Sequence, residues 1–189
     1  GAHPGSRRAE FQTWVTSFES TSFQQSPLLI AGIMPAEMGN CQSLPSTMST
    51  YTIEQYNPEW VKKFESIEVM LEGVFDEQAL AIVHVGSTSV PGMKAKPIID
   101  VLVVVKDVKL LNTGKMLMQS KGYLVEENYV APNTLLFRLV NENGNKLENI
   151  HVCENGAPMQ KQFLFMRDYL RAFPKEANSY AQLKDELVR

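Results

Sequence analysis

One segment of the sequence concentrates residue types that can bind phosphate. It runs from His84 to Asp100 and contains Gly86-Ser-Thr-Ser89 between two apolar stretches, with Lys94 and Lys96 further along. A strand that ends in Gly-Ser places backbone N–H groups and hydroxyls at its tip, where an anion can accept hydrogen bonds. We therefore predict a phosphate site made of Gly86, Ser87, Thr88, Ser89 and Lys96.

Asp100 interrupts the apolar run from Pro97 to Val105. An ionised carboxylate in a buried strand is costly unless it is paired, hydrogen-bonded or bound to a metal ion. Two interpretations remain open. Either Asp100 accepts hydrogen bonds from the Gly86–Ser89 segment and ties two strands together, or it binds a ligand or metal.

His151 is the candidate catalytic partner of Asp100. It alternates with Asn149 and Cys153 on one face of a predicted strand, so it can point towards the same site. Its imidazole can bind a metal, act as a base or contact phosphate when protonated. A buried histidine with its hydrogen bonds satisfied is an equally good interpretation.

Two arginines are candidate phosphate ligands, because a guanidinium can bind phosphate through two hydrogen bonds. Arg138 lies on a predicted strand, and Arg167 lies next to Asp168 on a predicted helix. An Arg–Asp pair on a helix is equally typical of a structural contact. We expect Lys184 to belong to an ordinary exposed helical face.

These residues must be positioned by helices and strands, and the sequence predicts both. Asn57 is a good N-cap and Pro58 suits the first position of a helix. Apolar periodicity predicts helices at residues 58–71, 107–121, 158–173 and 175–188, and strands at 79–85, 97–105, 123–126, 135–141 and 146–153. This order predicts an α+β domain with a mixed β-sheet packed by helices.

Apolar side chains predict which helix faces are buried. Trp60, Phe64, Ile67 and Leu71 form one face of the first helix. The same reasoning assigns Val108, Leu111, Met116 and Met118 to the second helix, and Tyr180, Leu183 and Leu187 to the last.

The composition is that of an ordinary globular domain. Hydrophobic residues make up 44% and charged residues 21% of 189 residues, and the net charge of −3 disfavours bulk nucleic acid as a partner. No apolar run is long enough for a membrane span, and two cysteines do not suggest a disulfide framework. We expect a cytoplasmic protein.

Residues 1–47 differ from the rest. They are rich in Ser, Gln, Thr, Gly and Pro and have no sustained apolar period, whereas Met48-Ser-Thr50 resembles a native start. We predict that residues 1–47 form a disordered or vector-derived tail and that residues 48–189 form the folded domain.

The Gly86-Ser87 turn, a loop and then Asp100 in an apolar strand resemble the signature of polymerase-beta-like nucleotidyltransferases. That resemblance implies that the turn holds nucleotide phosphates and that Asp100 binds Mg²⁺. A second acidic residue is expected two positions after Asp100, but Leu102 stands there.

A longer series of motifs resembles the GrpB family, which has a nucleotidyltransferase-like fold. The motifs are Tyr56-Asn-Pro-Glu-Trp60, His84-Val-Gly-Ser-Thr-Ser-Val-Pro-Gly92, Lys96-Pro-Ile-Ile-Asp100, His151-Val152 and Phe165-Met-Arg-Asp-Tyr-Leu-Arg-Ala-Phe-Pro174, followed by Tyr180 and Lys184.

Three functions remain open. The first is a nucleotidyltransferase that binds a nucleoside triphosphate and Mg²⁺, with Asp100 and His151 as catalytic residues. The second is a noncatalytic or repurposed site for an anionic metabolite on the same fold. Leu102 favours the second, whereas Glu148 or Glu154, if folding brings it to Asp100, favours the first. The third is a protein-interaction module that uses the C-terminal helices.

Overall fold

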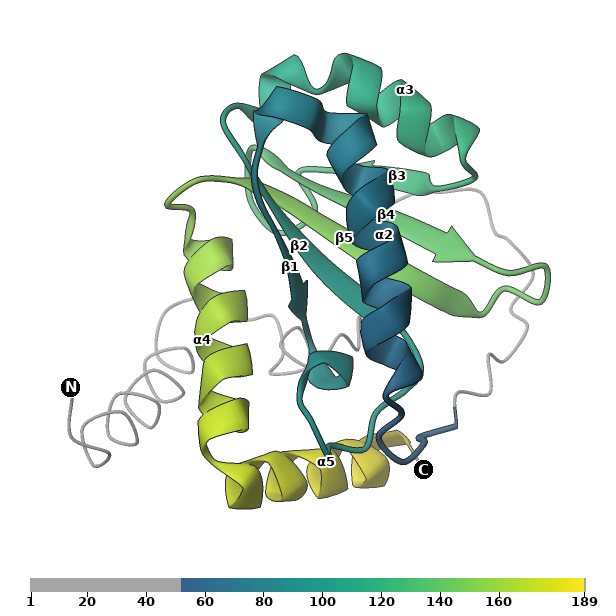
Figure 1. Ribbon diagram of the computed structural model, residues 1–189, viewed down its shortest axis with the longest axis vertical. Helices are drawn as coiled ribbons and strands as arrows, with labels where there is room; N and C mark the ends of the chain where they lie inside the picture. The colour runs from purple at the N-terminus through teal and green to yellow at the C-terminus, as the bar shows by residue number, and fades with distance from the viewer. Residues whose placement is uncertain (1–51, 189) are drawn as a thin grey trace. The chain divides into compact units, whose positions relative to one another are not determined.

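The computed structural model describes residues 52–188, with side chains up to residue 184 (Figure 1). The tail predicted for residues 1–47 lies outside this part of the chain. The helices are α2 (Glu59–Phe75), α3 (Asn112–Ser120), α4 (Pro158–Ala172) and α5 (Pro174–Val188). The strands are β1 (Ala79–Val85), β2 (Ile99–Val105), β3 (Leu124–Glu127), β4 (Thr134–Val140) and β5 (Lys146–Glu154).

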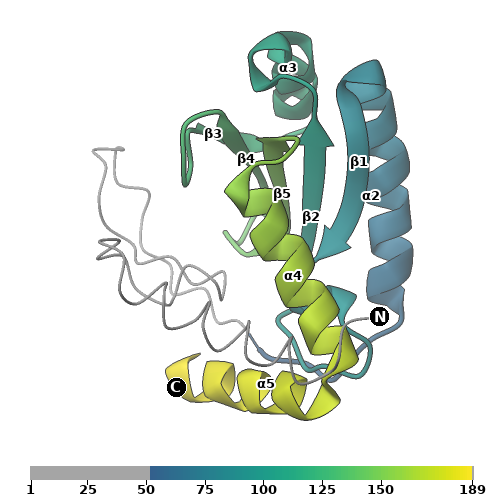
Figure 2. The same ribbon diagram turned by 90° about the vertical axis from the view of Figure 1, so that its left-hand side faces the viewer.

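The five strands form one mixed sheet in the order β1-β2-β5-β4-β3. Strands β2 and β5 are parallel, and the other neighbours are antiparallel. Helices α2 and α3 cover one face, α4 covers the other, and α5 crosses one end of the sheet (Figures 1 and 2). The prediction of an α+β fold with a mixed sheet packed by helices is confirmed.

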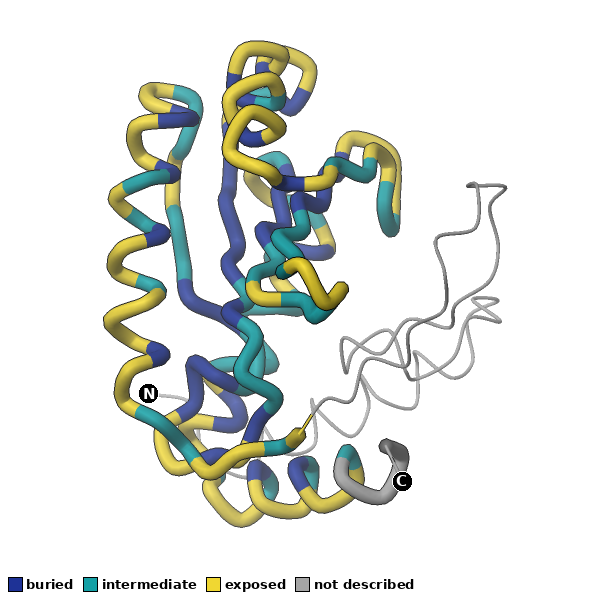
Figure 3. The backbone as a smooth tube through the Cα atoms, turned by 90° about the vertical axis from the view of Figure 1, so that its right-hand side faces the viewer, coloured by how far each residue is buried: buried dark blue, intermediate teal, exposed yellow. Residues whose placement is uncertain are grey.

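Helix α2 follows the predicted pattern. The Asn57 side chain accepts the backbone N–H of Glu59 at 3.0 Å, as an N-cap does. Trp60, Ile67 and Leu71 are buried against the sheet, while the outer side of the helix is exposed (Figure 3). The packed layer between α2, α3 and the sheet is the main apolar core.

The predicted helix at residues 107–121 is wrong in its first part. The Asp107 side chain accepts the backbone N–H of Lys109 at 2.8 Å and starts a separate 3₁₀ turn, Val108–Leu110, before α3 begins. Met116 is 70% exposed, so it is not a core residue. A side chain at Gly114 would lie 3.1 Å from the Phe75 ring, so this glycine lets α3 pack closely on α2.

The prediction that Leu183 lies on the buried face of α5 is wrong, since this side chain is 52% exposed.

Among residues 52–188, no helix combines the length and apolar character that a membrane crossing requires.

Candidate functional site

The candidate site lies where β1 ends and β2 begins. Val85 pairs with Asp100 in the antiparallel ladder, so the Gly86–Ser89 turn, which follows β1 directly, lies beside the Asp100 carboxylate. The Asp100 side chain is 25% exposed and can therefore reach solvent or a ligand. Folding thus brings together the two parts of the predicted phosphate site.

Gly86 is required at the start of the turn for two reasons. Its φ of +70° is unfavourable for residues with a side chain. In addition, a Cβ atom at this position would lie 2.4 Å from Oδ2 of Asp100. The backbone of the turn therefore passes directly against one carboxylate oxygen.

Two of the three hydroxyls of the turn donate hydrogen bonds to backbone carbonyls. Thr88 Oγ1 donates to the Ile98 carbonyl at 3.1 Å, and Ser89 Oγ donates to the Gly86 carbonyl at 2.7 Å. Both residues are buried, whereas Ser87 is only partly buried. Ser87 is therefore the hydroxyl of the turn best placed to meet a ligand.

His84 supports the turn from the opposite face of the sheet. Its ring stacks on Phe64 of α2 with a centroid distance of 4.9 Å, and its Nε2 lies 3.1 Å from Thr88 Oγ1. Burial lowers the pKa of His84 to about 4. The imidazole is therefore neutral at pH 7 and acts as a packing and hydrogen-bonding group.

Asp100 accepts a hydrogen bond from Asn149 rather than from the turn. Asn149 Nδ2 lies 2.8 Å from Asp100 Oδ1, because these residues are direct neighbours in the parallel β2–β5 ladder. His151 lies on the same face, with Nε2 3.8 Å from the same oxygen and its ring 4.6 Å from the Phe163 ring of α4. The predicted meeting of Asp100 and His151 therefore occurs.

Among the described residues, neither glutamate considered as a second carboxylate joins Asp100. Leu102 follows it on the same face and is fully buried in an apolar cluster beneath α4. Glu148 lies on the other face and accepts the Tyr123 hydroxyl, and Glu154, at the far end of β5, accepts the Val108 N–H at 3.3 Å. Neither glutamate fulfils the role considered for it.

The donor set therefore does not fit two magnesium ions. Across the part of the chain that the structure describes, no group of three His, Cys, Asp or Glu side chains is arranged to hold a metal ion. Two-metal sites rely on several carboxylate oxygens to bind both ions, and one carboxylate supplies too few.

Lys184 of α5 is the main unexpected member of the site. The prediction of an ordinary exposed position is wrong, since Lys184 is partly buried and its ammonium donates a hydrogen bond to Ser87 Oγ. The ammonium also lies 4.9 Å from the centre of the Tyr180 ring. Burial lowers the pKa of Lys184 to about 8, an effect that Asp100 opposes and Lys96 reinforces.

Lys146 and Lys184 interact with Asp100, and two further cations interact with these lysines. Burial lowers the pKa values of Lys96 and Lys146, and the positive charges of Arg138 and Lys96 lower that of Lys146 further. Arg138 forms an ion pair with Glu126 at 3.1 Å and lies over the Tyr129 ring. The interacting set has four cations, Lys96, Arg138, Lys146 and Lys184, but two carboxylates, Asp100 and Glu126.

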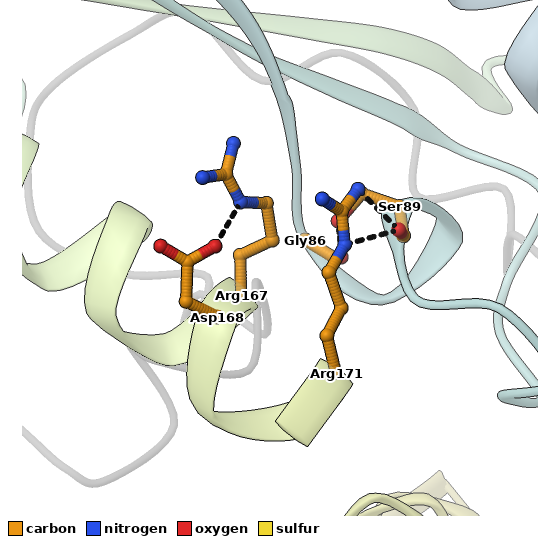
Figure 4. A network of polar contacts seen from close by, with 5 residues as sticks. All are labelled: Gly86, Ser89, Arg167, Asp168 and Arg171. Carbon is orange, nitrogen blue, oxygen red and sulfur yellow. Dashed lines mark hydrogen bonds and ion pairs between the residues drawn. The ribbon is translucent and has the colours of Figure 1, made fainter. Parts of the chain in front are cut away.

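Arg171 of α4 points towards the turn, whereas Arg167 of the same helix points towards Asp168 (Figure 4). Arg167 pairs with Asp168 at 2.7 Å through Nε, as in the structural interpretation, and its side chain is 16% exposed. Arg171, which the sequence reasoning did not select, donates from Nε and Nη2 to the Ser89 carbonyl at 3.1 and 2.8 Å. Its place one turn after Arg167 on the same helix was the available signal.

The sequence of this chain matches the GrpB protein family over residues 50–189. The chain belongs to the GrpB family. UPF0157 protein YqkA of Bacillus subtilis is 39% identical over 135 residues, which are 70% of this chain and 38% of that protein. UPF0157 protein BH1888 of Halalkalibacterium halodurans is 33% identical, over 75% of this chain and 71% of that protein.

A solved structure supports the fold of this GrpB-family chain. The crystal structure of the conserved protein GrpB from Enterococcus faecalis aligns with a TM-score of 0.68 and 29% identity, covering 72% of this chain and 82% of that one. A cytoplasmic RNA terminal U-transferase aligns with a TM-score of 0.42 and 14% identity, a likeness too low to support a conclusion about activity.

Proposed function

We propose that this GrpB-family domain binds a phosphorylated small molecule, either a nucleotide or another metabolite, at the Gly86–Ser89 turn. The observation that carries the proposal is the contact of Lys184 with Ser87 beside Asp100. A hydroxyl and an ammonium at the tip of a strand form a donor pair suited to phosphate oxygens.

The electrostatics of the surrounding residues support an anionic ligand. The chain carries a net charge of −3, yet the electrostatically linked set that contains Asp100 has four cations and two carboxylates. Such a local excess of positive charge attracts a phosphate group even on an acidic protein. Lys96, Arg138 and Arg167 remain predicted phosphate ligands within this proposal.

The turn is held rigidly enough to offer a fixed binding geometry. Arg171 donates hydrogen bonds to the Ser89 carbonyl. The buried Thr88 hydroxyl connects His84 to the carbonyl of Ile98, the residue just before β2. Groups held by packing and supporting hydrogen bonds lose little freedom when a ligand binds, which favours affinity.

The test is isothermal titration calorimetry with inorganic phosphate, pyrophosphate, nucleoside mono-, di- and triphosphates and sugar phosphates. Lys184→Met should weaken binding of the best ligand by about 10- to 100-fold, because one charge-assisted hydrogen bond is lost. The matched control is Lys175→Met, which removes an exposed lysine from the same helix. Equal affinity of the two variants, or absence of binding by all these compounds, would contradict the proposal.

Nucleotidyl transfer is the second candidate function. It is favoured by the position of Ser87 and Asp100, which lie side by side as in the resemblance described above, with His151 as a candidate catalytic neighbour. Incubation with a labelled nucleoside triphosphate, Mg²⁺ and an acceptor that carries a free hydroxyl should then bond the acceptor oxygen to the α-phosphorus and release pyrophosphate and a proton. Asp100→Asn should abolish both the labelling of the acceptor and the release of pyrophosphate.

A further inference from the structure

We infer that Lys184 supplies the counter-charge that a divalent metal ion supplies in carboxylate-rich phosphate sites, so that anion binding by this chain is independent of metal. The inference rests on the proposed phosphate binding. It adds the physical basis of recognition and identifies the C-terminal helix α5 as a necessary part of the site.

Both oxygens of Asp100 already contact protein groups. Oδ1 accepts the Asn149 amide at 2.8 Å, and Oδ2 lies against the backbone of Gly86. Each contact occupies one side of a carboxylate oxygen, so fewer of its lone pairs are open to a metal ion.

The neighbouring position on the same face offers no metal ligand. Leu102 replaces a potential ligand with an alkyl group that is fully buried in an apolar cluster with Val85 and Val104. Water can reach Asp100 from its exposed side, but it cannot complete the coordination shell of an ion from the side of Leu102.

Electrostatic interactions near Ser87 and Asp100 also favour an anion over a metal ion. Lys184 interacts electrostatically with Asp100 and Lys96, and Lys146 interacts with Asp100, Arg138 and Lys96. These cations repel a divalent ion and attract a phosphate group. Because opposite charges attract strongly where burial limits screening, an ammonium beside Ser87 can neutralise phosphate without a metal.

Helix α5 brings Lys184 to the turn. The helix crosses the end of the sheet where the turn lies (Figures 1 and 2), and Lys184 reaches Ser87 from a position 97 residues later in the chain. The Tyr180 ring, one turn earlier on α5, lies next to the ammonium and favours its position by a cation–π contact.

The experiment measures pyrophosphate binding by calorimetry, once in excess EDTA and once in excess Mg²⁺. The wild-type dissociation constant should differ by less than about threefold between the two buffers, once the pyrophosphate that Mg²⁺ binds in solution is accounted for. Lys184→Met should lose at least about tenfold in both, and Lys184→Arg should retain most of the affinity. Circular dichroism and thermal unfolding show that each variant is folded.

A second measurement addresses the metal directly. Mn²⁺ titrated alone and followed by electron paramagnetic resonance should bind the wild type no more tightly than Asp100→Asn. A wild-type affinity for pyrophosphate that rises by about tenfold or more with Mg²⁺, or a Mn²⁺ site that Asp100→Asn removes, would overturn the inference and leave the proposed function intact. No binding of any anion in either buffer would overturn both.

Discussion

The two faces of the sheet carry one buried histidine each, and their surroundings differ. On the face covered by α2, His84 stacks on Phe64 and its Nε2 bonds to Thr88. On the face covered by α4, Nδ1 of His151 is buried and has no hydrogen-bond partner among the described residues, and Nε2 lies 3.8 Å from Asp100.

This difference favours the α4 face as the side of the proposed binding site. The α2 face forms the main apolar core, and polar side chains such as Tyr123 and Glu148 pair with each other there. The α4 face becomes polar towards the turn, where Asp100, Asn149 and His151 lie together. Proteins retain incompletely paired buried polar groups mainly where function requires them, which supports a binding site on the α4 face.

The largest effect should come from Gly86→Ala, which changes the point where the turn meets Asp100. Left-handed backbone strain and the contact of the new Cβ with Oδ2 at 2.4 Å should together destabilise the domain by about 2–4 kcal/mol and abolish phosphate binding. Urea unfolding and calorimetry measure the two effects.

Gly92→Ala is the matched control for Gly86→Ala. Its φ of +78° produces similar backbone strain, but no atom lies within 4 Å of a Cβ at that position. The cost should be about 1 kcal/mol, with binding retained. Equal effects of the two substitutions would show that the close approach to Asp100 has no role.

A smaller effect on stability should appear at low pH, and it should come from His84 on the α2 face. The pKa of His84 is lowered to about 4 in the folded state, whereas the ordinary value is 6.5. Between these values the unfolded chain binds more protons than the folded one, so wild-type stability should fall by about 2–3 kcal/mol as pH decreases from 6.5 to 4 and then level off.

His84→Gln should lack this part of the pH dependence while retaining a donor for Thr88. The comparison is made by urea unfolding of both proteins at several pH values, so that the carboxyl groups they share cancel. Parallel stability profiles would mean that His84 is not held neutral by burial.

The smallest effect should come from Arg171→Lys, which tests how α4 supports the turn. Lysine retains the charge but cannot donate in the fork geometry by which Arg171 binds the Ser89 carbonyl. We expect a loss of about 1 kcal/mol in stability and a several-fold weaker affinity for the phosphate ligand. An affinity equal to that of the wild type would show that the contact of Arg171 with the turn does not affect ligand binding.

Much of the fold could be predicted from local patterns. The five strands and the helices α2, α4 and α5 follow from apolar periodicity, Asn57 and Pro174, because these signals act over a few residues. The prediction failed at residues 107–121, where a local hydrogen bond of Asp107 begins a separate turn and packing against Phe75 explains Gly114.

The site was only partly predictable. Gly86, Ser87 and Asp100 could be selected because a turn between two apolar strands places them close together in sequence and in space. Lys184 could not be selected by spacing, since it reaches the turn from a helix 97 residues away. Arg171 is 82 residues from the turn, and only its place one turn after Arg167 offered a signal. Helical periodicity by itself assigned Lys184 to an exposed face.

The sequence by itself determined the α+β class, the GrpB resemblance and the presence of Leu102 where a second acidic residue was expected, because each depends on residue identity and short-range order. Only the tertiary structure decided that Glu148 and Glu154 lie away from Asp100 and that Lys184 contacts Ser87. The physical reason is that strand register and helix packing fix which distant side chains share a face, and these are properties of the whole fold.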